Sequence, residues 1–239
     1  MVYVNGWRGK IGVITPSSGT AAETDFHENV PEGVAVLTAR VSFEAVTLEG
    51  LSEMGSYVED ASALLSQALP DIIAFACTTG SLVGGVGYDK KIIDSIERRT
   101  GIPAITTSTA IVEAMNLLGI KKMAIATPYS DEVNQAEKTF LEDSGFEVAS
   151  IKGLGLLGPT EMPQVRYQQM YRLVKEVFSD DVDGIFVSCT GISVFNIIQM
   201  LEEDFKRPVI TSNQATLWAS LRKINIGTKI EGLGRLFEL

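Results

Sequence analysis

The residues with the greatest capacity for chemistry are the two cysteines, Cys77 and Cys189. Each follows a short apolar run and precedes a threonine. The thiolate is the reactive nucleophile, but a free thiol with a pKa of about 8.5 is mostly protonated at neutral pH. A helix that begins just after the cysteine lowers that pKa through its free N–H groups and dipole. We therefore predict two reactive thiols, each at the carboxyl end of a strand, just before a helix, with a lowered pKa.

Groups that can bind an anion lie close to both cysteines. Segments 77–81 and 189–193 offer backbone N–H groups, which suit a substrate carboxylate. The same donors would stabilise the enolate-like charge that forms when a proton leaves a carbon next to a carboxylate. Further donors are expected from the hydroxyls of Thr15, Ser17, Ser18, Thr78, Thr79, Tyr129 and Thr190. The sequence thus predicts a site for a small carboxylic acid with two thiols beside it.

An internal repeat relates the two cysteines. A shift of 112 residues places Cys77-Thr78 on Cys189-Thr190 and the Thr-Pro pair at 15–16 on the pair at 127–128. Farther along, the shift becomes 105, and residues 102–106 fall on residues 207–211. This period is far too long for a solenoid. It predicts two similar α/β halves related by a pseudo-two-fold axis.

The elements that hold these residues alternate between strands and helices. Short apolar, β-branched runs predict buried strands at Ile11–Thr15, Val34–Val41, Ile72–Ala76, Ala104–Thr106, Met123–Ala126, Phe146–Ile151, Gly184–Ser188 and Val209–Thr211. Buried strands that alternate with helices favour parallel sheets covered on both faces. We expect an α/β fold with two Rossmann-like halves, each a roughly four-stranded parallel sheet flanked by helices.

The repeat also predicts the domain borders and the place of the site. The first half would span residues 1–112, joined by the C-terminal segment 213–239, and the second half would span 113–212. Ligands in open α/β sheets bind beyond the carboxyl ends of the strands. Two halves that face each other would therefore bring the thiols into one cleft from opposite sides.

Apolar spacing predicts several of the helices. One covers residues 57–69, with an apolar stripe of Tyr57, Ala61, Leu64, Leu65 and Ala68. Two others, over residues 89–100 and 131–144, are followed by Gly101 and Gly145, which can close them. A last helix is expected over 213–222. The polar stretch 24–29, which contains the single histidine His27, predicts a solvated turn.

Composition narrows the classes of partner. The chain has 239 residues, 20 Lys and Arg against 30 Asp and Glu, and a net charge of −10, which makes nucleic acid an unsuitable partner. No apolar run is long enough to span a membrane, and the N-terminus does not resemble a signal peptide, so we expect a cytoplasmic protein. Two cysteines and one histidine at scattered positions predict no metal site.

At these residues the chain resembles the aspartate/glutamate racemase superfamily, in its maleate cis-trans isomerase and arylmalonate decarboxylase branch. The resemblance covers nearly the whole chain. Segments 12–20 and 77–81 are similar to the first two loops of that branch, and 189–191 carries the second thiol. Segments 126–134 and 232–237 resemble the decarboxylase, whereas 211–216 resembles the isomerases. The resemblance implies chemistry without a cofactor, and superfamily members are often homo-oligomers.

The resemblance also implies roles for single residues. In maleate isomerases the first thiolate adds to the alkene and the second thiol protonates the neighbouring carbon, so Cys77 would be the nucleophile and Cys189 the acid and base. The substrate-binding residues would be Thr15, Pro16, Ser17, Gly19, Thr78, Thr79, Tyr129, Thr190 and Gly191. The main hypothesis is therefore a cofactor-independent isomerase of a small dicarboxylate, most like maleate cis-trans isomerase.

Three other functions remain open. Arylmalonate decarboxylases carry only the second cysteine, so the presence of Cys77 counts against that activity on a disubstituted malonate. Gly19 stands where maleate isomerases usually carry an asparagine, which counts against a strict maleate isomerase. An amino-acid racemase would use the two thiols on opposite faces of one carbon. A binding protein for small carboxylates would keep the cleft without turnover.

Overall fold

The computed structural model describes residues 5–239 apart from 44 and 46, and it contains two four-stranded parallel sheets. The first sheet has the order β2-β1-β3-β4 and consists of β1 (Gly9–Pro16), β2 (Val34–Val41), β3 (Ile72–Phe75) and β4 (Ala104–Thr106). The second has the order β6-β5-β7-β8 and consists of β5 (Lys122–Thr127), β6 (Glu147–Gly153), β7 (Gly184–Val187) and β8 (Val209–Thr211). The two orders are equivalent, which confirms the predicted pair of similar halves.

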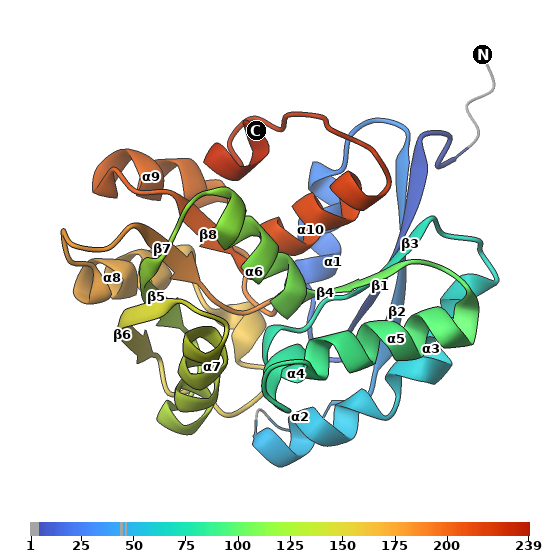
Figure 1. Ribbon diagram of the computed structural model, residues 1–239, viewed down its shortest axis with the longest axis horizontal. Coiled ribbons are helices and arrows are strands. Elements are labelled where there is room, and N and C mark those ends of the chain that lie inside the picture. Colours follow the sequence, from blue (N-terminus) through green and yellow to red (C-terminus); the bar gives the residue numbers. More distant parts are fainter. Residues whose placement is uncertain (1–4, 44, 46) are drawn as a thin grey trace.

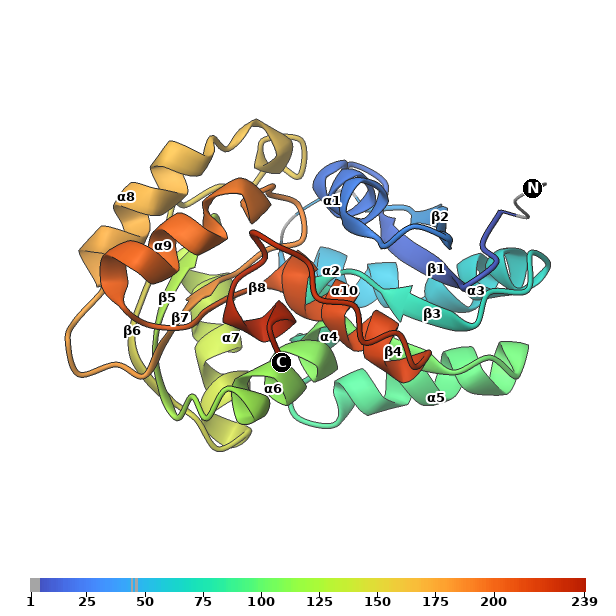
Figure 2. The same cartoon turned by 90° about the horizontal axis from the view of Figure 1, so that it is seen from above.

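Helices cover both faces of each sheet, as Figures 1 and 2 show. Those that follow strands of the first sheet are α1 (Ala21–Asn29), α2 (Leu48–Gly55), α3 (Val58–Ser66), α4 (Thr78–Leu82), α5 (Tyr88–Thr100) and α6 (Thr107–Leu117). The second half contains α7 (Asp131–Asp143), α8 (Tyr167–Val177), α9 (Ile198–Phe205) and α10 (Ser212–Lys223), with short 3₁₀ turns at Met162–Gln164, Phe195–Ile197 and Arg235–Phe237. Among the described residues, no helix is long and apolar enough to cross a membrane.

The equivalent helices α6 and α10 pack against each other between the sheets (Figures 1 and 2). Both begin in the same way, because Thr106 and Thr211 accept a hydrogen bond from the backbone N–H three residues later. Helix α10 contacts β3 and β4 of the first sheet as well as its own β8. The C-terminal part of the chain therefore reaches back to the first half, although the domain borders themselves stay a prediction.

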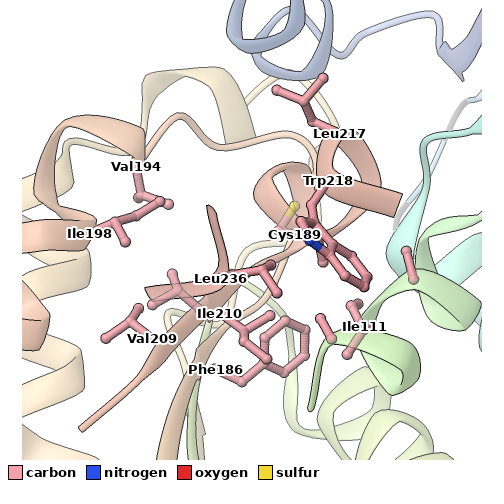
Figure 3. Packing of buried hydrophobic residues seen from close by; sticks show 14 of the residues in the cluster. Ile111, Phe186, Cys189, Val194, Ile198, Val209, Ile210, Leu217, Trp218 and Leu236 are labelled. Atoms are coloured by element: carbon pink, nitrogen blue, oxygen red, sulfur yellow. The ribbon is translucent and has the colours of Figure 1, made fainter. Parts of the chain in front are cut away.

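The largest apolar cluster joins the two halves. Figure 3 shows its side chains from α6, β7, β8, α9 and α10, together with Cys189. A smaller cluster lies under α2, α3 and α5 and includes Cys77. Each thiol thus lies at the edge of a water-excluding core, and this position bears on its acidity.

The structure corrects three local predictions. His27 is exposed but lies within α1, so the predicted turn is wrong. Of the predicted apolar stripe, Tyr57, Leu64 and Ala68 are exposed, because α3 ends at Ser66 and buries Val58, Ala61, Ser62 and Leu65 instead. Cys189 is followed by a turn and a 3₁₀ segment, and the next α-helix starts only at Ile198. Gly101, in contrast, closes α5 in a left-handed conformation with φ of 71°, as predicted.

Candidate active site

Cys77 and Cys189 line the same small cavity between the halves. Cys77 follows β3 and Cys189 follows β7, and the side chains are only 4% and 7% exposed. The cavity measures about 40 Å³, so it suits a small molecule. Its walls are formed by Thr15, Pro16, Ser18, Gly19, Phe43, Cys77, Thr79, Tyr129, Pro159, Met162, Cys189, Thr190 and Gly191.

Nine of the eleven residues predicted for the site line this cavity. The structure does not bring Ser17 or Thr78 to its wall. Ser17 is exposed, and Thr78 is buried below the cavity with its hydroxyl on Ser212. Phe43, Pro159 and Met162 are apolar wall residues that sequence reasoning missed, because they lie in connecting segments without a motif. The roles of all these residues stay predictions.

The Cys77 sulfur lies against the start of α4. The Gly80 backbone N–H and the Thr79 hydroxyl both bond to it. A Cβ atom at Gly80 would lie 2.8 Å from this sulfur and 2.4 Å from Cε of Met54, so only glycine allows so close an approach. The N-terminal donors predicted for the first thiol are therefore present.

The Cys189 sulfur has its own set of donors. The Gly191 N–H donates to Sγ at 3.2 Å, and the Tyr129 hydroxyl bonds to the same sulfur. Cys189 has a φ of 123°, in the left-handed region that L-residues rarely adopt. Its backbone N–H donates to Ser212 Oγ at 3.0 Å, which holds the strained residue in place. Strain of this kind persists where surrounding contacts over-determine the conformation, often at functional sites.

Burial overrides these donors and sets the acidity of both thiols. Loss of solvation raises the pKa of Cys77 to about 12 and that of Cys189 to about 11, although the N–H and hydroxyl donors act in the opposite direction. The phenol of Tyr129 is also buried, which raises its pKa well above the ordinary value. The predicted lowering of the thiol pKa is wrong, because the desolvating walls come from distant parts of the chain.

Polar bonds fix the loops that carry the candidate binding groups. Arg40 on β2 donates to the backbone oxygens of Ser17, at 3.0 Å, and Gly19, at 2.7 Å, in the loop after β1. In the loop after β5, the Tyr129 N–H donates to Thr127 Oγ1 at 3.0 Å. Hydrogen bonds therefore fix the backbone of the cavity wall, which favours binding of a ligand with little reorganisation of the loops.

Comparison with known proteins finds similarity over nearly the whole chain. A model of the arylmalonate decarboxylase family matches residues 11–237. The chain is 27% identical over 231 residues to an arylmalonate decarboxylase from Bordetella bronchiseptica, with 95% of this chain and 96% of that protein covered. It is 26% identical over 243 residues to a maleate isomerase from Pseudomonas putida, with 95% and 96% covered.

The fold comparison gives the same result. The crystal structure of the maleate isomerase Iso from Pseudomonas putida S16 superposes with a TM-score of 0.92 at 26% identity, over 96% of this chain and 98% of that chain. The resemblance that the sequence motifs predicted is confirmed over nearly the whole length. The chain belongs to the arylmalonate decarboxylase family.

Proposed function

We propose that this protein is a cofactor-independent isomerase of a small dicarboxylic acid, and that it converts maleate to fumarate. The observation that carries the proposal is the pair of thiols, one from each half, on the wall of a single small cavity. The similarity to maleate isomerases supports a substrate of this class. The proposal includes a cytoplasmic location and a homo-oligomeric assembly.

The proposed reaction uses both sulfurs and returns both to their starting states. The Cys77 thiolate adds to one alkene carbon, and the electron pair of the double bond moves to the neighbouring carbon and its carboxylate. The Cys189 thiol gives its proton to that carbon. The former double bond is now single and rotates. Cys189 then removes the proton again, and the carbon–sulfur bond breaks to release fumarate and the Cys77 thiolate.

The cavity wall offers groups for the two carboxylates. The hydroxyls of Thr15, Thr79 and Thr190 and the backbone at Gly191 are donors placed around the thiols. Such fixed donors stabilise the charge that develops when the carbanion forms, typically by 10²–10³-fold in rate for each donor. Ser17 and Thr78 would act through the backbone or through neighbours, because neither reaches the wall.

A second candidate is the decarboxylation of a disubstituted malonate. The apolar walls formed by Phe43, Pro159 and Met162 favour it, because they would suit an apolar substituent on the substrate. The similarity to an arylmalonate decarboxylase supports the same alternative. This reaction would need Cys189 as the proton donor but not Cys77.

Proton NMR in deuterated buffer separates the candidates. Maleate, aspartate, glutamate and a methyl-arylmalonate are incubated separately with wild type, Cys77→Ala and Cys189→Ala. We expect a fumarate signal from maleate with the wild type and its loss in both variants. Conversion of the methyl-arylmalonate to the monocarboxylic acid, with loss of carbon dioxide, in a reaction that needs Cys189 but not Cys77 would establish the decarboxylase instead. Deuterium at the α-carbon of an amino acid would establish a racemase, and no turnover of any compound would favour a binding protein.

A further inference from the structure

Two buried carboxyl groups occupy equivalent places in the halves. Asp25 on α1 and Glu137 on α7 are 112 residues apart, the same shift that relates the two cysteines. Asp25 is 3% exposed and Glu137 is fully buried. Acidic residues are almost never buried to this degree without a partner. Neither lines the cavity, and the proposed reaction does not use them.

Asp25 lies in the first half, and its side chain bonds to the segment that follows Cys189 in the second half. Its Oδ1 accepts a hydrogen bond from Ser193 Oγ at 2.5 Å, and its Oδ2 accepts one from Asn213 Nδ2 at 2.7 Å. Asn213 also donates to the backbone oxygen of Thr190 at 3.2 Å. The carboxylate therefore ties α1 and α10 to both ends of segment 190–193.

Glu137 bonds to the residue that precedes the same thiol. Its Oε1 accepts a hydrogen bond from the hydroxyl of Ser188, the residue before Cys189, at 2.5 Å. Its Oε2 is buried and has no hydrogen-bond partner within the described part of the chain. The charge of Glu137 acts on both Cys189 and Tyr129 and raises the pKa of each group.

The segment of Cys77 is held differently. Ser81, which is equivalent to Ser193, donates to the backbone oxygen of Cys77 at 2.7 Å and lies 2.6 Å from Ser108 Oγ. Ser188 has Ala76 as its equivalent, which offers no hydroxyl. No carboxylate bonds to residues 76–81 in the part of the chain that the structure describes. The two acids thus bond to residues next to Cys189 in the sequence and not to those next to Cys77.

We propose that Asp25 and Glu137 are positioning residues for Cys189: Asp25 fixes the segment after the thiol, and Glu137 places a negative charge behind it. That charge adds to the effect of burial in disfavouring the thiolate, so Cys189 stays protonated until a carbanion accepts its proton. The assignment rests on the proposed role of Cys189 as the acid. It gives the two chemically identical thiols different tasks.

The ionisation of both acids agrees with this role. Burial raises the pKa of Asp25 to about 6 and that of Glu137 to about 7, so both are mostly charged in mildly alkaline solution. The other titratable groups that act on these acids or on Cys189 are Glu28, Tyr129 and Cys77. None of them is a cation, and among the described residues no Lys, Arg or His forms an ion pair with Glu137.

Alkylation of the purified protein tests the proposal without any turnover. Wild type, Asp25→Asn and Glu137→Gln react with iodoacetamide between pH 7 and pH 10, and peptide mass spectrometry follows Cys189 and Cys77 separately. Cys77 is the internal control. Glu202→Gln is the matched control, since Glu202 is another buried carboxyl with a raised pKa, but it bonds to Val209 and Arg235 away from the cavity.

We expect Cys189 to be labelled roughly threefold to tenfold faster in Asp25→Asn and in Glu137→Gln than in wild type, as a pKa change of half a unit to one unit would cause, with Cys77 unchanged. In Glu137→Gln the pH profile of Cys189 shifts to lower pH, because a negative charge is removed. In Asp25→Asn the rate rises at every pH, because the segment opens. Equal changes at both thiols, the same change in Glu202→Gln, or no change would overturn the proposal.

Milder variants keep the test valid if an acid substitution prevents folding. Ser193→Ala and Ser188→Ala each remove one hydroxyl that donates to an acid and leave the acid in place. We expect Ser193→Ala to raise Cys189 labelling at every pH, as Asp25→Asn does. Unchanged labelling in both serine variants would overturn the proposal. Because labelling needs no substrate, its outcome is independent of whether maleate is turned over.

Discussion

The two sulfurs differ in backbone conformation although the repeat makes them equivalent. Cys77 is extended, with φ of −148°, whereas Cys189 has φ of 123°. A residue held in such a sparsely populated region costs about 1–3 kcal/mol. The bonds from Cys189 N–H to Ser212 and from Gly191 N–H to Sγ offset part of that cost. The thiol of Cys189 is therefore held at the cavity wall in a backbone conformation that lowers local stability.

The raised thiol pKa values predict a steep pH dependence. Below a pKa of about 11 the thiolate fraction rises about tenfold for each pH unit. We expect iodoacetamide labelling of the folded protein, and turnover of the substrate, to increase about a hundredfold between pH 7 and pH 9. At pH 7 labelling should be slower in the folded protein than in urea. Faster labelling in the folded protein would contradict the effect of burial.

Gly80 should be essential for the first thiol. In Gly80→Ala the new Cβ would lie 2.8 Å from Cys77 Sγ, so the sulfur or the Gly80 N–H must move away. We expect turnover to fall by roughly 10²-fold, as for loss of one fixed donor, while the protein stays folded by circular dichroism. Gly227→Ala is the control, since Gly227 is exposed and its Cβ would meet only the end of the Arg222 side chain. Equal activity of the two variants would contradict this role.

At the scale of single residues, the sequence predicted which side chains meet at the cavity but not the acidity of the two thiols. Residue types and spacing identified Cys77, Cys189, Thr79 and Tyr129, because strand ends are visible as apolar runs. The pKa direction depends on walls from several distant segments, which no local pattern contains. Asp25 and Glu137 were missed, although the same shift of 112 residues that aligned the cysteines also aligns these two acids.

Helix α10 links the two thiol segments at its first residue. Ser212 Oγ accepts a hydrogen bond from Thr78 Oγ1 at 2.8 Å and one from the Cys189 N–H at 3.0 Å. Thr78 is next to Cys77, so one serine fixes the chain beside both sulfurs. Because α10 packs on α6 and on the first sheet, the position of this serine is set by the whole interface between the halves.

Loss of the Ser212 hydroxyl should affect stability and activity together. Ser212→Ala leaves the buried Cys189 N–H without an acceptor, which costs about 1–3 kcal/mol. We expect the free energy of unfolding in urea to fall by that amount and kcat to fall at least about tenfold, as for a misplaced acid or base. Ser220→Ala, on the same helix, removes only a bond to Thr216 within α10 and should keep kcat. Loss of kcat in both would contradict a specific link.

The strands were predicted more accurately than the segment after Cys189. The predicted bounds of β2, β4 and β8 match the structure. Strands β4 and β8 are fully buried and read as short apolar runs, whereas β2 is buried mainly at its ends. The helix expected directly after Cys189 was transferred from the first half by the repeat. Residues 190–194 instead form a non-helical segment that begins with a turn. The side chains of Asp25 and Asn213, from elsewhere in the chain, hold this segment, and local spacing cannot show such bonds.

The whole molecule encloses its site between two halves of equal topology. Each sheet presents the carboxyl end of a central strand, β3 or β7, to the same cavity. Duplication of one half explains two features that the cysteines share. Each is followed directly by a threonine, and each is preceded, 52 residues earlier, by an acid that is buried. The halves differ in the turn after Cys189 and in the hydrogen bonds of the two buried acids. These differences can give Cys77 the role of nucleophile and Cys189 the role of acid.

The buried acids predict that the fold loses stability as pH rises. Asp25 and Glu137 have folded pKa values of about 6 and about 7, above their ordinary values of 3.8 and 4.5. Their contribution to stability is thus complete below pH 4 and is lost as pH rises through 7, on the order of 3 kcal/mol for each group. Urea unfolding at pH 5 and pH 8 should show a smaller decrease in Glu137→Gln than in wild type. An equal decrease in both would contradict the assignment.

The central claim is that the two thiols act on one substrate molecule, with Cys77 as the nucleophile. Intact-protein and peptide mass spectrometry of Cys189→Ser after incubation with maleate tests it most directly, with Cys77→Ala as the control. We predict a stable adduct with the mass of one maleic acid on the peptide that contains Cys77, and none in Cys77→Ala. Fumarate formation by Cys77→Ala at the wild-type rate, with no adduct in either variant, would contradict the claim.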